Sequence, residues 1–477
     1  MNMEDALYWA KQIQKGAISA EELFLETIEK IENINPQLNA VVRTRYDKAL
    51  YEIQTRPLSK TMYKGVPILL KDLGQNLKGE LNTCGSSLLQ NNVSNHTDNL
   101  VKKIEELGFI VIGQTNAAEF GFTNFTDNML YGTTRNPVDM TRHAGGSSGG
   151  AASAVSGDMI PLALASDGGG SIRIPASWTG TIGLKPSRGR IPVGPFSYRG
   201  WQGASIHFAI TKSVRDTKAL FYALQTEQWE SPFTLPLNKE LPMIKPLKIA
   251  YSTKSPVGTP VSDAAKNAVY YTVQMLKELG CIVEEATPKL DGIGLMQSYY
   301  MMNSAETAAM FCDMEMSLKR PLTREDMNIM AWIIYQSGKD LLASDYTKAL
   351  SCWDSAAAVV TDFHEEYDVF LQPSTADVAP KLTEYGIQHK LFEKMANDVE
   401  STTSTKRKLD IVWEMFLKGL TLTPFTQQAN LTGQPAISLP IYQTKNGLPL
   451  GVQLTARKGR EDILFALSEQ LEPYFLS

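Results

Sequence analysis

The chain has 477 residues, of which 43% are hydrophobic and 20% are charged, and its formal net charge is −5. This composition is typical of a globular protein with a large core, and the weak negative charge argues against nucleic acid as a partner. No apolar run approaches the roughly 18 residues that a membrane span requires, and no signal-peptide pattern follows the acidic start at Met1–Asp5. We therefore expect a cytoplasmic protein without a membrane partner.

The cysteines are scattered along the chain without a C-x-x-C pair: Cys84, Cys281, Cys312 and Cys352. Scattered thiols in a chain of this length are typical of a reducing compartment. We expect them to be buried packing residues, with Cys312 as the one that could line a pocket.

Residues 1–62 are predicted to be mainly helical. Ser19-Ala20-Glu21-Glu22 has the spacing of a helix-capping box, and the helix that it begins is expected to end near Asn35-Pro36. This segment is assigned no chemistry.

A short apolar run over Val66–Leu70 predicts a buried strand that leads to Lys71. Residues 98–107 predict a helix, which Gly108 ends before a strand over residues 109–113. A helix followed by a strand in this way indicates an α/β sheet.

The stretch 116–140, which includes Glu119 and Asn124, lacks clear periodicity and is expected to be a long loop that forms a pocket wall. Alternatively, its polar side chains satisfy the backbone of the loop itself. Beyond it, residues 151–155 predict a helix of small residues that can pack closely under a site, and residues 161–165 predict a buried strand. Trp178 is expected in the core rather than in a pocket wall.

The second half opens with a connector marked by four prolines: Pro232, Pro236, Pro242 and Pro246. Residues 247–251, 262–279 and 281–285 then predict a strand, a helix and a strand. This β-α-β unit indicates that the connector joins two lobes of one sheet rather than two free domains.

Residues 295–367 are helix-like and rich in Met, Tyr and Trp, a pattern more typical of a core than of a cofactor site. Strands are expected over residues 367–374, 435–440 and 450–454, and a final helix over residues 461–472.

Two runs rich in glycine and serine carry the candidate chemistry: Gly145–Gly150 and Asp167–Arg173. Glycine lets backbone N–H groups approach a ligand closely, so the second run can direct several of them at one oxyanion. Ser171 is the candidate nucleophile beside them. The candidate oxyanion donors are the backbone groups of Gly168, Gly169, Gly170 and Ser171.

A serine nucleophile needs a base, and the histidines form no recognisable pattern with Ser171: His96, His143, His207, His364 and His389. A G-x-S-x-G elbow is also absent, because Arg173 occupies its last position. Lys71 is the better candidate, since a lysine drawn into a poorly solvated place has a lowered pKa and can act as a base.

Each feature also has a plainer interpretation when taken alone. A glycine- and serine-rich run is more often a flexible linker, and a lysine followed by aspartate after an apolar run is usually a solvated strand end. Glycines near a helix start can cradle phosphate, but the pattern G-x-x-x-x-G-K-[ST] is absent.

Taken together and in this order, the motifs resemble the amidase signature family. Lys71 in Gly65-Val66-Pro67-Ile68-Leu69-Leu70-Lys71-Asp72 matches the family's lysine, and Ser147 precedes Ser171 by the spacing of its bridging serine. The resemblance continues through Gly183-Leu184-Lys185-Pro186 to Gly433-Gln434-Pro435-Ala436.

The resemblance implies one α/β domain over residues 1–477, with a mixed, mostly parallel sheet sandwiched by helices. Its parts are a helical N-terminal segment (1–62), a catalytic lobe (63–230) and a second lobe (247–477) with the helical insertion 295–367, which in this family often shapes the pocket.

The implied function is hydrolysis of a carboxylic amide through Lys71, Ser147 and Ser171 and an acyl-enzyme, without a metal or organic cofactor. Ser148, Asp167 and Arg173 are implied supporting residues, the last two as a pair that braces the nucleophile loop. The implied partner is a small-molecule amide, and a homodimer is left open.

Within the family, Gly194-Pro195-Phe196 and Trp201-Gln202-Gly203 look most like general amidases and 6-aminohexanoate-cyclic-dimer hydrolases. Residues 203–209 depart from the Ser-Leu-Asp-Gln-Ile-Gly-Pro run of the glutamyl-tRNA amidotransferase A subunit. That subunit remains an alternative, as does a binding or scaffold module that has lost activity.

Overall fold

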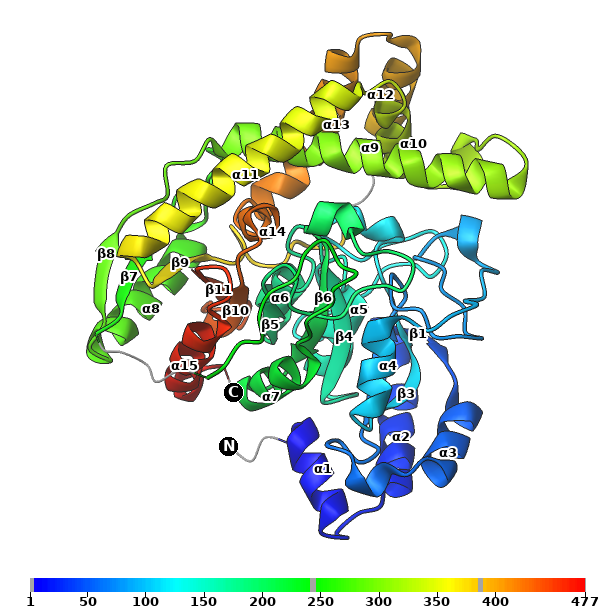
Figure 1. Cartoon of the computed structure of the whole chain (residues 1–477), viewed down its shortest axis with the longest axis vertical. Helices are drawn as coiled ribbons and strands as arrows, with labels where there is room; N and C mark the ends of the chain where they lie inside the picture. Colours follow the sequence, from blue (N-terminus) through cyan, green and yellow to red (C-terminus); the bar gives the residue numbers. More distant parts are fainter. Residues whose placement is uncertain (1–3, 241–245, 385–388, 477) are drawn as a thin grey trace.

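The computed structural model describes residues 4–240, 246–384 and 389–476. It contains a single continuous sheet of eleven strands in the order β1-β3-β2-β4-β6-β5-β10-β11-β9-β7-β8 (Figure 1). The strands are β1 (Val41–Thr44), β2 (Pro67–Lys71), β3 (Ile110–Thr115), β4 (Leu162–Asp167), β5 (Ile182–Lys185), β6 (Ile206–Thr211), β7 (Lys248–Tyr251), β8 (Ile282–Glu285), β9 (Val369–Pro373), β10 (Ala436–Gln443) and β11 (Pro449–Ala456).

Helices surround this sheet, and α9, α10, α12 and α13 lie above it in the view of Figure 1. They are α1 (Ala6–Gln14), α2 (Ala20–Leu38), α3 (Tyr46–Thr55), α4 (Asn99–Glu106), α5 (Gly149–Ser156), α6 (Arg173–Thr179), α7 (Val214–Leu224), α8 (Asp263–Glu278), α9 (Gly292–Leu318), α10 (Ile329–Gly338), α11 (Ala343–Glu366), α12 (His389–Ser401), α13 (Thr405–Leu422), α14 (Gln427–Thr432) and α15 (Glu461–Leu471).

The mixed α/β class is confirmed, but the expectation of a mostly parallel sheet is wrong. Among the described strands, six neighbouring pairs are antiparallel and four are parallel. The parallel pairs lie toward the ends of the strand order, where crossovers through α4 and α8 return the chain in the same direction. In the middle, the short turn between β10 and β11 leaves no room for a crossover, so these two strands must run in opposite directions.

The predicted β-α-β unit of the second half is confirmed, because β7 and β8 pair in parallel and flank α8. Strand β9 adds to β7 on its other side, again in parallel. Strands before and after the connecting segment thus belong to one sheet. Of its four prolines, Pro242 lies outside the described residues.

The capping box at Ser19 is confirmed, since the Ser19 side chain and the Glu22 side chain each bond the other's backbone N–H. The helix was predicted to end near Asn35-Pro36, and it ends two residues after Pro36. The helix continues to Leu38, whose buried side chain packs into the core, and Asn39 ends it in a left-handed conformation. The mainly helical N-terminal segment also contains a strand that was not expected, β1, paired with β3.

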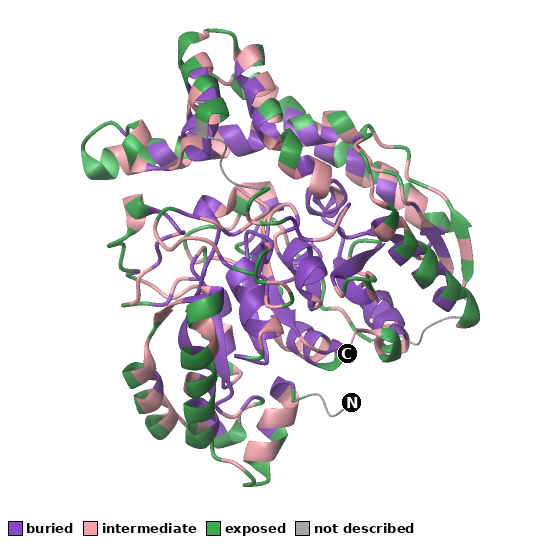
Figure 2. Cartoon of the chain, turned by 180° about the vertical axis from the view of Figure 1, so that it is seen from behind, coloured by how far each residue is buried: buried purple, intermediate pink, exposed green. Residues whose placement is uncertain are grey.

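Two short buried helices lie behind the glycine- and serine-rich runs. Every residue of α6 is buried, and in α5 only Ser156 is not. A Cβ atom on Gly150 would stand 2.4 Å from the backbone nitrogen of Asn116, so close packing under the site is confirmed. Figure 2 shows buried residues filling the centre of the molecule, with exposed ones on the outer helices.

Helices α9 and α10 of the insertion lie at the top of Figure 1 and share a core with α12 and α13. Phe311, Trp332 and Tyr335 lie in that core, so the interpretation of the Met- and aromatic-rich pattern as packing is confirmed. Trp178 is 1% exposed, which confirms its place in the interior.

The expectation of buried cysteines is wrong. Cys84, Cys281 and Cys352 are half-buried, and Cys312 is exposed on α9. Because α9 packs with only part of its circumference, its outward residues remain in solvent. Within the described residues, no helix is both long and apolar enough to cross a membrane.

Candidate active site

Lys71 ends β2 and is completely buried. Its Nζ lies 2.8 Å from Ser147 Oγ and 2.9 Å from Ser166 Oγ. Burial lowers the pKa of this amine to about 7, even though the nearby Asp167 carboxylate acts in the opposite direction. A substantial part of the Lys71 population is therefore neutral near neutral pH.

The backbone around Lys71 is fixed by Gln75. The amide nitrogen of Lys71 donates to Gln75 Oε1 at 2.6 Å, and Gln75 Nε2 donates to the carbonyl oxygen of Ala165 at 3.1 Å. Strands β2 and β4 are thereby joined beyond their ladder, which positions Lys71 opposite Ser166.

Ser147 lies just before α5, after a cis peptide bond between Gly146 and Ser147. A Cβ on Gly146 would stand 2.5 Å from the backbone nitrogen of Phe125, so only glycine fits at that position. The neighbouring Ser148 Oγ donates to the carbonyl oxygen of Ser166 at 3.1 Å. Ser148 thus attaches the Ser147 loop to β4, which agrees with a supporting role.

Ser171 lies in the turn between β4 and α6, and the predicted pair braces that turn. Arg173 Nη2 lies 2.9 Å from Asp167 Oδ1, with both side chains completely buried. Arg173 also donates to Gln453 Oε1 and Asn430 Oδ1. Although burial opposes ionisation, Arg173 holds the pKa of Asp167 at about 2, so the pair is ionic.

The four candidate oxyanion donors are not equivalent. The N–H of Gly170 donates to Asp167 Oδ1 at 2.7 Å. This N–H therefore helps to hold the turn and is not free to bind an oxyanion. A Cβ on Gly168 would stand 2.7 Å from the Trp201 ring, and one on Gly169 would stand 2.6 Å from the Tyr299 hydroxyl. Aromatic side chains therefore press against this turn, which accounts for its glycines.

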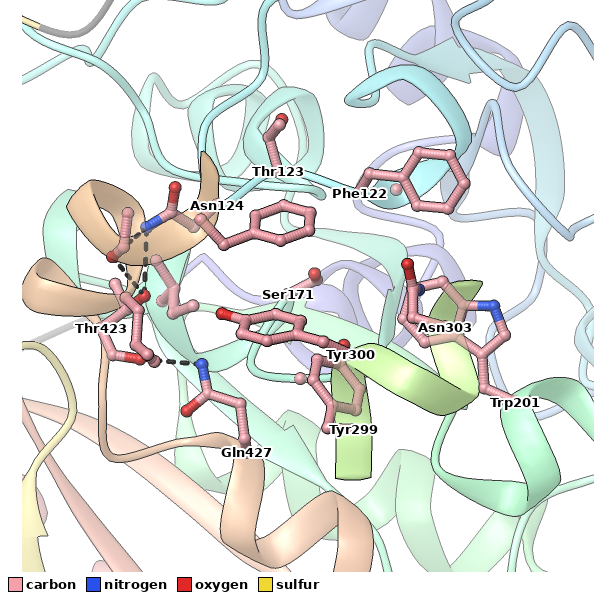
Figure 3. A pocket seen from close by; sticks show the side chains of 16 residues that line it. Phe122, Thr123, Asn124, Ser171, Trp201, Tyr299, Tyr300, Asn303, Thr423 and Gln427 are labelled. Atoms are coloured by element: carbon pink, nitrogen blue, oxygen red, sulfur yellow. Dashed lines mark hydrogen bonds between the residues drawn. The ribbon is translucent and has the colours of Figure 1, made fainter. Parts of the chain in front are cut away.

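Two cavities meet at Ser171. The asparagine cavity, of about 70 Å³, is shown in Figure 3. The methionine cavity has a volume of about 210 Å³. Ser171, Phe122 and Trp201 line both cavities, and the Phe122 and Trp201 rings are nearly parallel, with centroids 6.3 Å apart. Besides these, the asparagine cavity is lined by Asn124, Tyr299, Tyr300, Asn303, Thr423 and Gln427. The methionine cavity is lined by Phe120, Ser147, Ser166, His207, Glu306, Met310 and Met314.

The prediction that the loop 116–140 forms a pocket wall is confirmed by Phe122 and Asn124. Asn124 Nδ2 reaches across the cavity edge to the carbonyl oxygen of Gly419 and to Thr423 Oγ1, at 2.9 and 3.0 Å (Figure 3). The alternative interpretation holds for another part of the same loop, because Asn128 satisfies the backbone of Ala117 and Tyr131.

Sequence reasoning missed several residues of this site. Ser166 lies within β4, next to Asp167, and no motif in the sequence connects it with Lys71. His207 pairs with Ser166 across β4 and β6 and lines the methionine cavity. Burial lowers the pKa of His207 to about 4, so it is neutral near pH 7. The predicted insertion supplies Tyr299 and Asn303, but nothing in its pattern singled them out.

Comparisons with known proteins show which family the chain belongs to. A family model described as amidase matches residues 22–465. The chain belongs to the amidase family. No group of three or more His, Cys, Asp or Glu side chains that could hold a metal ion is found in the described part of this amidase.

Three similar proteins illustrate the relationship. A lipoamidase from Enterococcus faecalis is 38% identical over 98% of this chain, which spans only 63% of that protein. A 6-aminohexanoate-cyclic-dimer hydrolase from Paenarthrobacter ureafaciens is 31% identical, over 98% of this chain and 94% of the relative. A solved structure of 6-aminohexanoate cyclic dimer hydrolase complexed with substrate has a TM-score of 0.89 and 29% identity, and it covers all of this chain and 98% of the other.

Family and relatives together identify an enzyme that hydrolyses amide bonds. They disfavour the alternative of a binding or scaffold module without activity.

Replacing Arg173 by alanine tests the brace. Because the Asp167 carboxylate would remain buried without its cation, Arg173→Ala should lower the free energy of unfolding by about 3–5 kcal/mol. Lys406→Ala, which breaks an exposed ion pair with Asp410, is the control and should cost less than about 0.5 kcal/mol. Urea unfolding measures both, and equal losses would show that the buried pair contributes no more than a surface pair.

Proposed function

We propose that this amidase hydrolyses carboxylic amides through Ser171, Ser147 and Lys71, with the whole chain acting as one catalytic unit. The observation that carries the proposal is the 2.8 Å contact between Lys71 Nζ and Ser147 Oγ beside the cavity that Ser171 also lines. A buried amine with a pKa of about 7 is suited to act as a base near neutral pH.

In the proposed first step, neutral Lys71 takes a proton from Ser147 while the Ser147 oxygen takes the proton of Ser171. Ser171 Oγ then attacks the amide carbonyl carbon. The N–H groups of Gly168, Gly169 and Ser171 donate to the oxyanion, since the N–H of Gly170 is held by Asp167. One such donor is typically worth about 3–4 kcal/mol in the transition state.

In the second step, Ser147 gives its proton to the leaving nitrogen, Lys71 returns the proton that it holds to Ser147, and the C–N bond breaks. Protonation matters because an amine without its proton is a poor leaving group. Water then attacks the acyl-enzyme, with the same serine and lysine taking its proton, and releases the acid.

For the substrate, we propose a small amide that is aliphatic on both sides of the scissile bond. Aromatic and apolar side chains, among them Tyr300 and Met310, line the cavities on both sides of Ser171. The names of the similar proteins also denote aliphatic amides. The glutamyl-tRNA amidotransferase subunit remains the alternative function, disfavoured by residues 203–209.

Replacing the nucleophile tests the first assignment. Ser171→Ala should abolish amide hydrolysis and leave the unfolding midpoint nearly unchanged, because one hydroxyl is lost. After treatment of the wild type with a fluorophosphonate, peptide mass spectrometry should find the adduct on Ser171. Ser355→Ala, on an exposed helix position, is the matched control and should label normally. An adduct on Ser147 or on a cysteine would refute the assignment.

The protonation state of Lys71 gives a pH dependence. The neutral amine is the base, and its fraction grows as pH rises through the pKa, so kcat/KM should rise around pH 7 and level off above it. Lys71→Arg keeps a cation that does not lose its proton, so activity should fall by on the order of a thousandfold or more. Lys394→Arg, at an exposed position, should keep full activity. Substantial activity in Lys71→Arg would mean that another group is the base.

The amidotransferase alternative is tested by measuring whether the purified chain is active on its own. The purified chain should hydrolyse a simple aliphatic amide without partner proteins, ATP or tRNA, because Lys71, Ser147 and Ser171 all belong to this one chain. Release of the amine is followed directly with an amine-specific fluorescent reagent. Activity that appears only after those components are added would support the amidotransferase alternative.

A further inference from the structure

The two cavities at Ser171 differ in their relation to Ser147, which lines the methionine cavity but not the asparagine cavity. In the proposed mechanism, on which this inference rests, Ser147 gives its proton to the leaving nitrogen. That nitrogen must therefore face Ser147, and its substituent continues into the methionine cavity. The acyl chain is left with the asparagine cavity.

The cavities also differ in charge. The polar side chains of the asparagine cavity are uncharged amides and hydroxyls, and its lining within the described residues includes no Asp, Glu, Lys, Arg or His. The lining of the methionine cavity includes Glu306. Two other titratable residues there are neutral near pH 7, because burial lowers the pKa of His207 to about 4 and raises that of Cys84 to about 12.

Glu306 is held in place without a cation. Its Oε1 accepts hydrogen bonds from Gln202 Nε2, at 2.9 Å, and from the Tyr346 hydroxyl. In the described residues, Glu306 forms no ion pair with lysine, arginine or histidine. A half-buried carboxylate whose hydrogen-bond partners are both neutral favours a cation in the cavity beside it.

The helix α9 fixes where that charge lies. Tyr299 and Asn303 line the asparagine cavity, and Glu306, Met310 and Met314 follow on the same helix in the methionine cavity. At about 1.5 Å of rise per residue, Met310 and Met314 lie about 6 and 12 Å beyond Glu306 along the helix axis. An alkyl chain attached to the leaving nitrogen would therefore pass apolar side chains close to one fixed carboxylate.

We propose that the methionine cavity receives the amine half of the substrate and that Glu306 selects amines carrying a second, positively charged amino group. The preferred substrates are then monoacylated alkyl diamines with an uncharged acyl chain.

Two isomeric amides test the proposal. Hexanoyl-(5-aminopentyl)amide carries its ammonium on the amine half, and 6-aminohexanoyl-pentylamide carries it on the acyl half. The uncharged hexanoyl-pentylamide is the reference. The wild type should cleave the first isomer with a kcat/KM about tenfold above the reference, and the second should fall below the reference.

Glu306→Gln keeps an oxygen that can accept from Gln202 and Tyr346 but removes the charge. In this variant, the ratio of kcat/KM for the first isomer to kcat/KM for the reference should fall to about one, and an unchanged thermal unfolding midpoint reports a folded enzyme. Asp313→Asn, an exposed position on the same helix, is the matched control and should keep the wild-type preference.

Inhibition of the wild type gives a measurement that needs no variant. 1,5-Diaminopentane should inhibit hydrolysis of the reference about tenfold more strongly than pentylamine does. Equal inhibition, an unchanged preference in Glu306→Gln, or a preference for the second isomer would overturn the proposal. If the wild type cleaved none of the three amides but hydrolysed others, the proposed aliphatic substrate class would fail, and this inference with it.

Discussion

The removal of the Lys71 amine from water is the constraint on which the catalytic arrangement depends. A buried ammonium loses most of its hydration, and only two serine hydroxyls replace that water here. The resulting fall in pKa is limited by the Asp167 carboxylate, which favours the charged amine. Arg173 in turn holds Asp167 as a carboxylate. The lysine's protonation is therefore set by a chain of buried charges that also positions the nucleophile loop.

Several features of the fold and of the site that the sequence predicted are determined over short stretches of chain. The capping box joins Ser19 to Glu22, three positions away, and the ion pair joins Asp167 to Arg173, six positions away. The glycine clusters were expected to let backbone N–H groups approach a ligand, and the structure adds that Gly168 and Gly169 leave room for Trp201 and Tyr299. These features depend little on how distant segments are arranged.

The parts that could not be predicted depend on tertiary arrangement. The relative direction of two neighbouring strands depends on how the chain between them crosses the sheet. The hydrophobic periodicity that predicts a strand does not indicate this direction. Ser166 became a partner of Lys71 only because β2 and β4 are neighbours. Asn124 and Thr423, which line the asparagine cavity and share a hydrogen bond, are almost three hundred positions apart in the sequence. A single sequence gives no signal that such residues meet.

The contacts of Arg173 with Asn430 and Gln453 have a consequence for how the enzyme is made. The nucleophile loop is encoded in the first half of the chain, whereas these two partners are encoded near the far end of the second half. A growing polypeptide can therefore form the strands around Ser171 well before it can complete the brace. For most of its synthesis, the chain therefore lacks part of the hydrogen bonding that holds Arg173. These bonds form only when the segment that carries Asn430 and Gln453 packs against the nucleophile loop.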